Sequence, residues 1–133
     1  MRMLQQQEDE LGEGGDVTWE DQSSINAFSK LNVKLQTIQE QLRSQHEEKE
    51  DLDDLGTELE LIVDEDERLG YKVGDAFVMM TVEEINSRLQ NDMQCKDLRI
   101  QKLVEEADSV REQMEALKKL LYARFGRSIN LEN

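Results

Sequence analysis

The residues best suited to chemistry are few and are not grouped in this sequence. His46 is the only histidine and Cys95 the only cysteine, so a cysteine–histidine zinc site and an internal disulfide are both excluded. His46 has no second histidine or cysteine with which to form a nucleophile–base pair, and we expect it to be a solvated helix residue. No GxGxxG or GxxxxGKS/T phosphate-binding motif is present. The sequence therefore predicts neither an enzyme nor a bound cofactor.

The acidic residues are concentrated in one block. Residues 47–67 hold twelve acids and Lys49, within a chain of net charge −15. Asp51 and Asp53 are spaced as in a calcium-binding EF-hand loop, but Leu55 and Ile62 stand at the fifth and twelfth positions, where oxygen ligands are needed. We expect solvated acids and no metal. A surface this acidic repels phosphate backbones, which argues against a nucleic-acid partner.

Two long helices must carry the rest of the chain, because proline is absent and apolar residues recur at helical spacing. The heptad pattern predicts helices over about 19–62 and about 82–125, opened by caps at Thr18 and Thr81. Residues 1–16 are predicted to be a disordered acidic tail. No stretch approaches ~18 unbroken apolar residues, and the N-terminus lacks an apolar signal core. We therefore expect an intracellular protein that does not enter a membrane.

The two apolar stripes have similar lengths, which predicts an antiparallel two-helix coiled coil. In the matching register Phe28 faces Leu117, and Leu42 faces Leu103. Lys49 then falls near Lys96, and two like charges at one level predict a local loss of stability.

Between the helices the period changes to that of strands, which predicts a β-hairpin over about 68–80 with Gly74-Asp75 as a type II′ turn. An isolated two-stranded ribbon is marginal in water, and residues 76–80 are apolar on both faces. We expect the helices to leave nothing to cover this hairpin, so it should pair with other chains. The expected assembly residues are Tyr71, Val73, Gly74, Ala76, Phe77, Val78 and Met79.

At the opposite end of the helices the sequence gathers more apolar groups than a two-helix tip can bury. Such a tip predicts a protein-binding surface, a cluster that caps the coiled coil, or both. Phe125 and Ile129 lie nearest or beyond the predicted helix stop at Gly126, where we expect the smallest packing role. The candidate binding residues are Trp19, Ile25, Phe28, Leu121, Tyr122, Phe125, Ile129 and Leu131.

Three segments resemble the β-type subunits of the prefoldin family. They are residues 17–29, which contain VTWEDQ and INAFS, residues 71–78, YKVGDAFV, and residues 121–132, LYARFGRSINLE. The likeness spans about residues 17–132, so the resemblance implies one prefoldin β-type domain over 17–133.

The resemblance implies a fold and a function. It implies a mainly α protein whose hairpin contributes to an intersubunit β-barrel in a hetero-hexamer of α-type and β-type prefoldin subunits. It also implies an ATP-independent holdase that captures unfolded actin and tubulin at the coiled-coil tips. The implied destination of these clients is the cytosolic group II chaperonin, in a cytoplasmic protein for which a nuclear location stays open.

Two other functions stay open at this point. A generic coiled-coil scaffold would oligomerise through its heptad seam and tolerate disruption of the hairpin. An acidic chaperone for basic proteins such as histones would bind its partners through residues 47–67 in a salt-sensitive manner.

Overall fold

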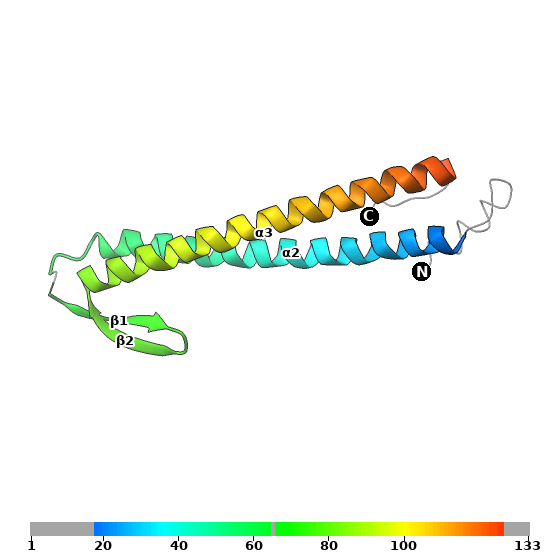
Figure 1. The fold of residues 1–133 in the computed structure, drawn as a ribbon. Coiled ribbons are helices and arrows are strands. Elements are labelled where there is room, and N and C mark those ends of the chain that lie inside the picture. Colours follow the sequence, from blue (N-terminus) through cyan, green and yellow to red (C-terminus); the bar gives the residue numbers. More distant parts are fainter. Residues whose placement is uncertain (1–17, 65, 127–133) are drawn as a thin grey trace. The chain divides into compact units, whose positions relative to one another are not determined.

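The computed structural model describes residues 18–64 and 66–126. It contains two long helices, α2 (Trp19–Leu59) and α3 (Val82–Phe125), and two strands, β1 (Arg68–Val73) and β2 (Ala76–Thr81) (Figure 1). This confirms the expected mainly helical fold with one small antiparallel hairpin. The predicted tail over 1–16, Ile129 and Leu131 lie outside the described residues.

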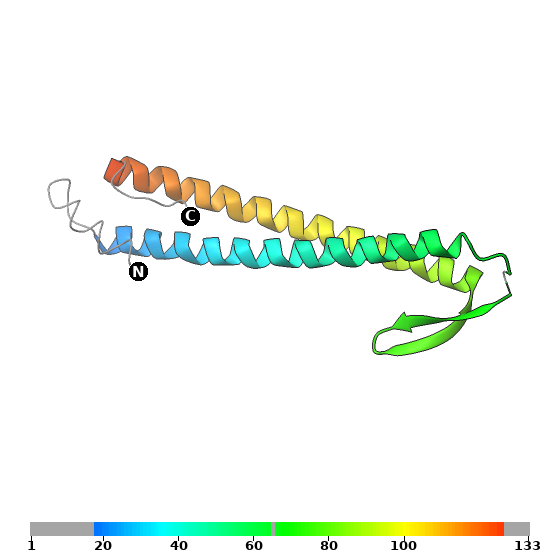
Figure 2. The same cartoon turned by 180° about the vertical axis from the view of Figure 1, so that it is seen from behind.

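Contacts divide the chain into two compact units, each described by itself. The terminal unit comprises Met1–Gln39 and Glu105–Asn133, and the hairpin unit comprises Glu40–Val104. Each unit therefore holds one segment of α2 and one of α3, which run side by side in opposite directions (Figures 1 and 2). Within residues 18–64 and 66–126, neither helix has the apolar length that crossing a bilayer requires.

The helix starts are built as the sequence predicts. At the start of α2, the Asp21 amide donates to Thr18 Oγ1 at 3.1 Å and the Thr18 amide donates to Asp21 Oδ2 at 3.0 Å, which is a reciprocal capping box. At the start of α3, the Glu84 amide donates to Thr81 Oγ1 at 3.3 Å. The Thr81 hydroxyl in turn donates to Glu84 Oε1 at 3.2 Å, so each threonine satisfies one otherwise unpaired amide of its helix.

The first helix ends at Leu59, three residues before the expected position 62. Its last turn contains no basic residue, whereas Glu58, Glu60 and Asp64 place negative charge at and after this end. Carboxylates oppose the negative end of the helix macrodipole, which accounts for the early stop. Two turn bonds, from the Leu61 amide to Glu58 O and from the Ile62 amide to Leu59 O, close the end. By contrast, α3 runs to Phe125, and Gly126 follows with a φ of 65°.

The hairpin pairs β1 and β2 antiparallel, from Arg68 opposite Thr81 to Val73 opposite Ala76. Of the two turn residues, Gly74 has the positive φ, 62°, as the first position of a type II′ turn requires. The strand β2 ends at Thr81 and α3 begins at the next residue, Val82, so no linker separates the hairpin from the helix.

Candidate assembly hairpin and protein-binding end

One face of the hairpin packs against the helices of its own unit. Tyr71 is 5% exposed and joins Leu59, Ile85 and Leu89 in one buried cluster. Other hairpin side chains packed against this cluster are Leu69, Val73 and Met80. The expectation that the helices leave nothing to cover the hairpin is therefore wrong for this face. The sequence argument missed it because it assigned Leu59 and Leu89 to helix–helix packing alone, whereas they also contact the hairpin in this cluster.

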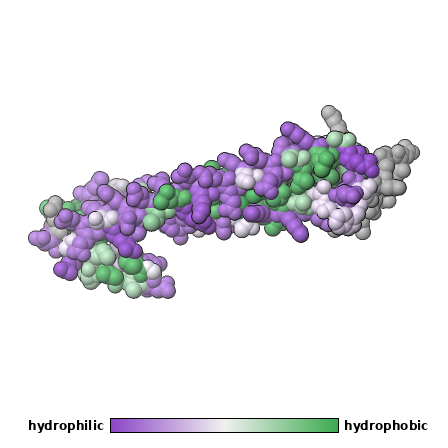
Figure 3. Space-filling model, viewed as in Figure 1, coloured by the Kyte–Doolittle hydropathy of each residue, from purple (hydrophilic) through white to green (hydrophobic). Residues whose placement is uncertain are grey.

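The other face of the hairpin is open and apolar. Side chains alternate along a strand, and paired residues share a face, so Phe77 and Met79 point away from the helices with Lys72 and Gly70 opposite them. Phe77 is 72% exposed and Met79 58% exposed. A Cβ added at Gly70 would lie 3.7 Å from Phe77 and 3.9 Å from Met79, so these two side chains flank the glycine. Figure 3 shows apolar side chains gathered over this hairpin.

The remaining expected assembly residues divide between the turn and the covered face. Gly74 forms the turn. Ala76 and Val78 lie on the same face as Tyr71 and Val73, yet Val78 is still 43% exposed. Phe77 and Met79 are thus the most exposed large apolar side chains of the hairpin, whereas Tyr71 serves the internal packing.

A polar contact links the covered face to α3. The Tyr71 hydroxyl donates to Asp92 Oδ2 at 2.9 Å, and Asp92 Oδ1 lies 3.4 Å from Arg88 Nε. Burial, with the hydrogen bond and the negative charge of Asp92, raises the pKa of Tyr71 to about 12. The sequence analysis missed this role of Asp92, because no local spacing connects residues that are 21 positions apart.

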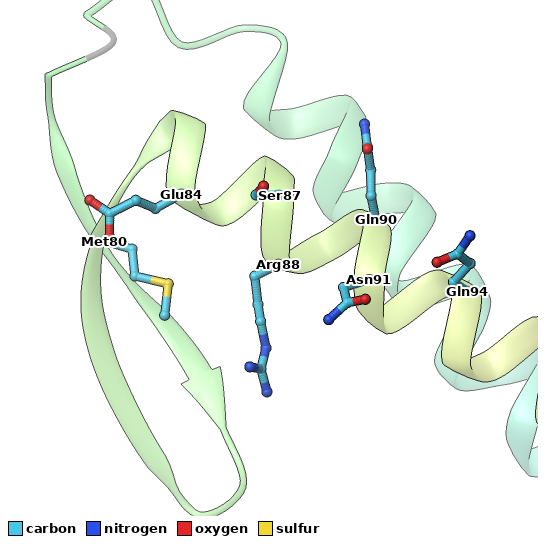
Figure 4. Close-up of a pocket in the computed structure, with 7 residues that line it drawn as sticks. All are labelled: Met80, Glu84, Ser87, Arg88, Gln90, Asn91 and Gln94. Atoms are coloured by element: carbon cyan, nitrogen blue, oxygen red, sulfur yellow. The ribbon is translucent and has the colours of Figure 1, made fainter.

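An open groove of about 680 Å³ lies between the end of β2 and α3. Met80 and Arg88 reach into the space beside the hairpin (Figure 4). The other lining residues are polar and come from α3: Glu84, Ser87, Gln90, Asn91 and Gln94. The groove therefore combines hydroxyl, amide and carboxylate groups with one guanidinium group and one thioether.

In the terminal unit, four of the six candidate binding residues that the structure describes form the core instead of the surface. Ile25, Phe28, Leu121 and Phe125 are each at most 6% exposed and pack in one cluster, with Tyr122 partly buried against it. The expectation that Phe125 has the smallest packing role is wrong: the helix continues through Phe125, so its ring is held against the core before the chain turns at Gly126. Leu117 packs against the same cluster as Phe28, as the predicted register requires.

The ends of the two helices are tied together in this unit by Arg124. Its Nε atom lies 3.3 Å from Asp21 Oδ2, and its guanidinium carbon lies 5.3 Å from the centroid of the Phe125 ring. Burial alone would raise the pKa of Asp21, but the hydrogen bonds from Thr18 and the charge of Arg124 outweigh it and lower the pKa. The capping box and the cross-helix ion pair therefore share one carboxylate.

Among the described residues of the terminal unit, three large apolar side chains are exposed to solvent: Trp19, Val33 and Leu120. Trp19 is 81% exposed and Leu120 is 58% exposed. Trp19 also borders an open groove of about 280 Å³ along α2, which is lined further by Gln22, Ser23, Asn26, Ala27 and Lys30. Among the expected tip residues that the structure describes, Trp19 is therefore the one that lies largely at the surface, and Leu120 is an exposed residue that the candidate set omitted.

The residues considered first for chemistry have no buried surroundings. His46 and Cys95 are both exposed. Among residues 18–64 and 66–126, no three histidine, cysteine or acidic side chains come close enough to hold a metal ion.

Comparison with known proteins now identifies the family. The family model described as "Prefoldin subunit" matches residues 22–128. The chain belongs to the prefoldin subunit family.

Individual members of this family are similar over most of the chain. "Prefoldin subunit 4" of Saccharomyces cerevisiae is 46% identical over 116 residues, covering 87% of this chain and 89% of the relative. "Probable prefoldin subunit 4" of Drosophila melanogaster is 31% identical, covering 87% of this chain and 83% of the relative. "Prefoldin subunit 4" of Homo sapiens is 29% identical, covering 87% of each chain.

A solved structure has the same fold. The crystal structure of the prefoldin beta subunit from Thermococcus strain KS-1 matches with a TM-score of 0.72 and covers 83% of this chain and 96% of that one. The two sequences are 15% identical, so this comparison supports the prefoldin β-type fold alone.

Proposed function

We propose that this chain is a subunit of the hexameric prefoldin co-chaperone, assembled from α-type and β-type subunits through their hairpins. The observation that carries the proposal is the outer face of the hairpin, where Phe77 and Met79 expose apolar surface in a chain whose relatives are named subunits. Burying this face against strands of neighbouring subunits would remove apolar area from water and satisfy the open strand edges.

In this assembly the chain acts as an ATP-independent holdase of the cytoplasm. It captures non-native actin and tubulin and passes them to the cytosolic group II chaperonin. Non-native chains expose apolar residues, so capture rests on apolar side chains that are open before the client arrives. Near the helix ends of the terminal unit these are Trp19 and Leu120, together with the half-buried Tyr122, whereas the exposed Val33 lies about four turns further along α2.

The proposed capture is tested by suppression of aggregation of chemically denatured actin. The complex is reconstituted from this chain and the other prefoldin subunits, with either the unchanged chain or the double variant Trp19→Ser and Leu120→Ser. Both residues are exposed, so the variant should assemble and unfold thermally like the unchanged chain while protecting actin less well. The loss should depend only weakly on salt, because screening acts on charges and not on apolar contacts.

A matched control is Val33→Ser, which removes an apolar side chain that is 61% exposed on α2 of the same unit. This control should protect actin fully. Protection by the Trp19/Leu120 variant equal to that of the control would remove these side chains from the capture surface. Strong salt dependence of the unchanged complex would instead favour binding through the acidic residues.

A further inference from the structure

We propose that the hydrogen bond from Tyr71 to Asp92 is a latch that fixes the angle between the β-hairpin and α3. It joins the middle of β1 to a position three turns into α3, at an oxygen–oxygen distance of 2.9 Å. Tyr71 is thereby a positioning residue for the outer face of the hairpin, which carries Phe77 and Met79.

The need for a latch follows from how the hairpin is attached. Its second strand continues directly into α3 at Thr81 and Val82, so this junction is the natural pivot. Its first strand is reached through a segment in which residues 60–64, 66 and 67 belong to neither a helix nor a strand. The remaining restraint is the apolar packing of Leu69, Val73 and Met80, which is not directional and permits sliding.

The hydrogen bond supplies the orientational restraint that the apolar packing lacks. Hydrogen bonds weaken steeply when the donor angle departs from linear, so a hydroxyl held on a buried ring accepts few orientations of the strand. Tyr71 is 5% exposed, and rotation that separated it from Asp92 would leave the hydroxyl without a partner in an apolar cluster. The carboxylate is held as well, because Arg88 Nε lies 3.4 Å from its other oxygen, Oδ1.

The latch also determines the shape of the groove between the end of β2 and α3. Arg88, which contacts Asp92, lines this groove together with Met80 at the end of β2 (Figure 4). If the hairpin turned about Thr81, Met80 and Arg88 would separate and the groove would change shape. The consequence for assembly rests on the proposed function, because the direction in which Phe77 and Met79 point matters only if the hairpin pairs with other subunits. The angle itself is a property of the single chain.

The test measures that angle directly with two spin labels on the full chain. One label is placed on Cys95, an exposed residue of α3, and the other on Asp75→Cys at the turn of the hairpin. Labelled chain is diluted with unlabelled chain, so that any self-association adds no second distance. We expect one narrow distance distribution for the otherwise unchanged chain.

Tyr71→Phe keeps the ring and removes only the hydroxyl, so it should broaden and shift the distribution while helix content by circular dichroism stays the same. Asp92→Ala should have the same effect, and combining the two changes should add nothing. Asp92→Asn keeps an oxygen that accepts from Tyr71 and should restore most of the narrow distribution. The matched control is Tyr122→Phe, which removes the only other tyrosine hydroxyl and lies in the terminal unit.

An unchanged distribution in Tyr71→Phe would overturn the latch, because apolar packing alone would then hold the angle. A broadening as large in Tyr122→Phe would overturn it as well. These results are independent of the proposed function: a chain that fails to join other prefoldin subunits still reports its own distance.

Discussion

Lys96 Nζ lies 2.7 Å from Glu48 Oε2 across the two helices of the hairpin unit. The neighbouring Lys49 makes the reciprocal contact, with its Nζ atom 2.6 Å from Asp97 Oδ1. Each lysine thus reaches an acid on the opposite helix instead of facing the other lysine. These contacts offset the expected repulsion between Lys49 and Lys96, because each long flexible side chain reaches an acid one position away from the other lysine. The predicted local loss of stability stays a prediction.

Whether Lys96 stabilises or destabilises the chain can be measured with Lys96→Gln. Loss of the Glu48 contact should lower the stability of the chain by about 0.2–1 kcal/mol at low salt, the usual range for exposed ion pairs. The difference should shrink as salt is added. Lys102→Gln, at an exposed lysine of α3 in the same unit, is the control. If Lys96→Gln stabilised the chain and Lys102→Gln did not, repulsion between Lys49 and Lys96 would outweigh the contact with Glu48.

The ionisation of Tyr71 gives a second prediction. In a Tyr122→Phe background, the tyrosine absorbance of the folded chain should titrate near pH 12, because burial and Asp92 both disfavour the phenolate. A raised pKa means that the stabilising contribution is complete below the ordinary value of 10.0 and is lost as the pH rises towards about 12.

Asp92→Asn should bring this titration to lower pH, since it removes the negative charge but not the burial. Circular dichroism at each pH shows whether the helices persist. A midpoint near 10 in the folded, otherwise unchanged chain would contradict the buried hydrogen bond.

A third prediction separates packing from binding in the terminal unit. Phe125 is 6% exposed, so Phe125→Ala should cost about 3–5 kcal/mol, as expected for a buried aromatic residue. Leu120 is 58% exposed, and Leu120→Ala should change stability by less than about 0.5 kcal/mol. Hydrogen exchange over residues 19–39 and 105–125 reports this difference. Equal protection in the two variants would mean that Phe125 is not part of the core.

Gly56 provides a fourth prediction. Alanine at a helix interior position is favoured over glycine by about 1 kcal/mol. Here an added Cβ would lie 3.2 Å from Leu89 Cδ2, and Leu89 is 4% exposed within the hairpin-unit core. We therefore expect that Gly56→Ala gives no gain in melting temperature. Asp54→Ala, on the exposed side of the same helix, is the comparison, and a clear gain for Gly56→Ala would show that Leu89 can move aside.

The parts of the fold that depend on local patterns could be predicted from the sequence. The heptad spacing indicates two helices, and the register that places Phe28 beside Leu117 is confirmed by their shared cluster. Thr18 and Thr81 cap their helices because the cap requires only neighbours in sequence. The confirmed fold class follows from these signals together with the Gly74 turn.

The parts that depend on contacts between distant residues could not be predicted in this way. Tyr71 has the apolar spacing of an assembly residue, but its hydroxyl partner is Asp92 on another element. Phe125 stands at a helix end, and only the packing of Ile25 and Phe28 opposite it determines that its ring is buried. The roles expected for residues 127–133, including Ile129 and Leu131, stay predictions.

Assembly through the outer face of the hairpin is the central claim, and native mass spectrometry of the reconstituted complex tests it most directly. Phe77→Asp places a charge at the centre of that face, where it cannot be buried against another strand. The matched control is Leu98→Asp, the same kind of change at a 66% exposed position of α3 in the hairpin unit. We predict that the unchanged chain and the control enter the hexamer, whereas Phe77→Asp keeps its helix content and is absent from it. Entry of Phe77→Asp at the yield of the unchanged chain would contradict the account.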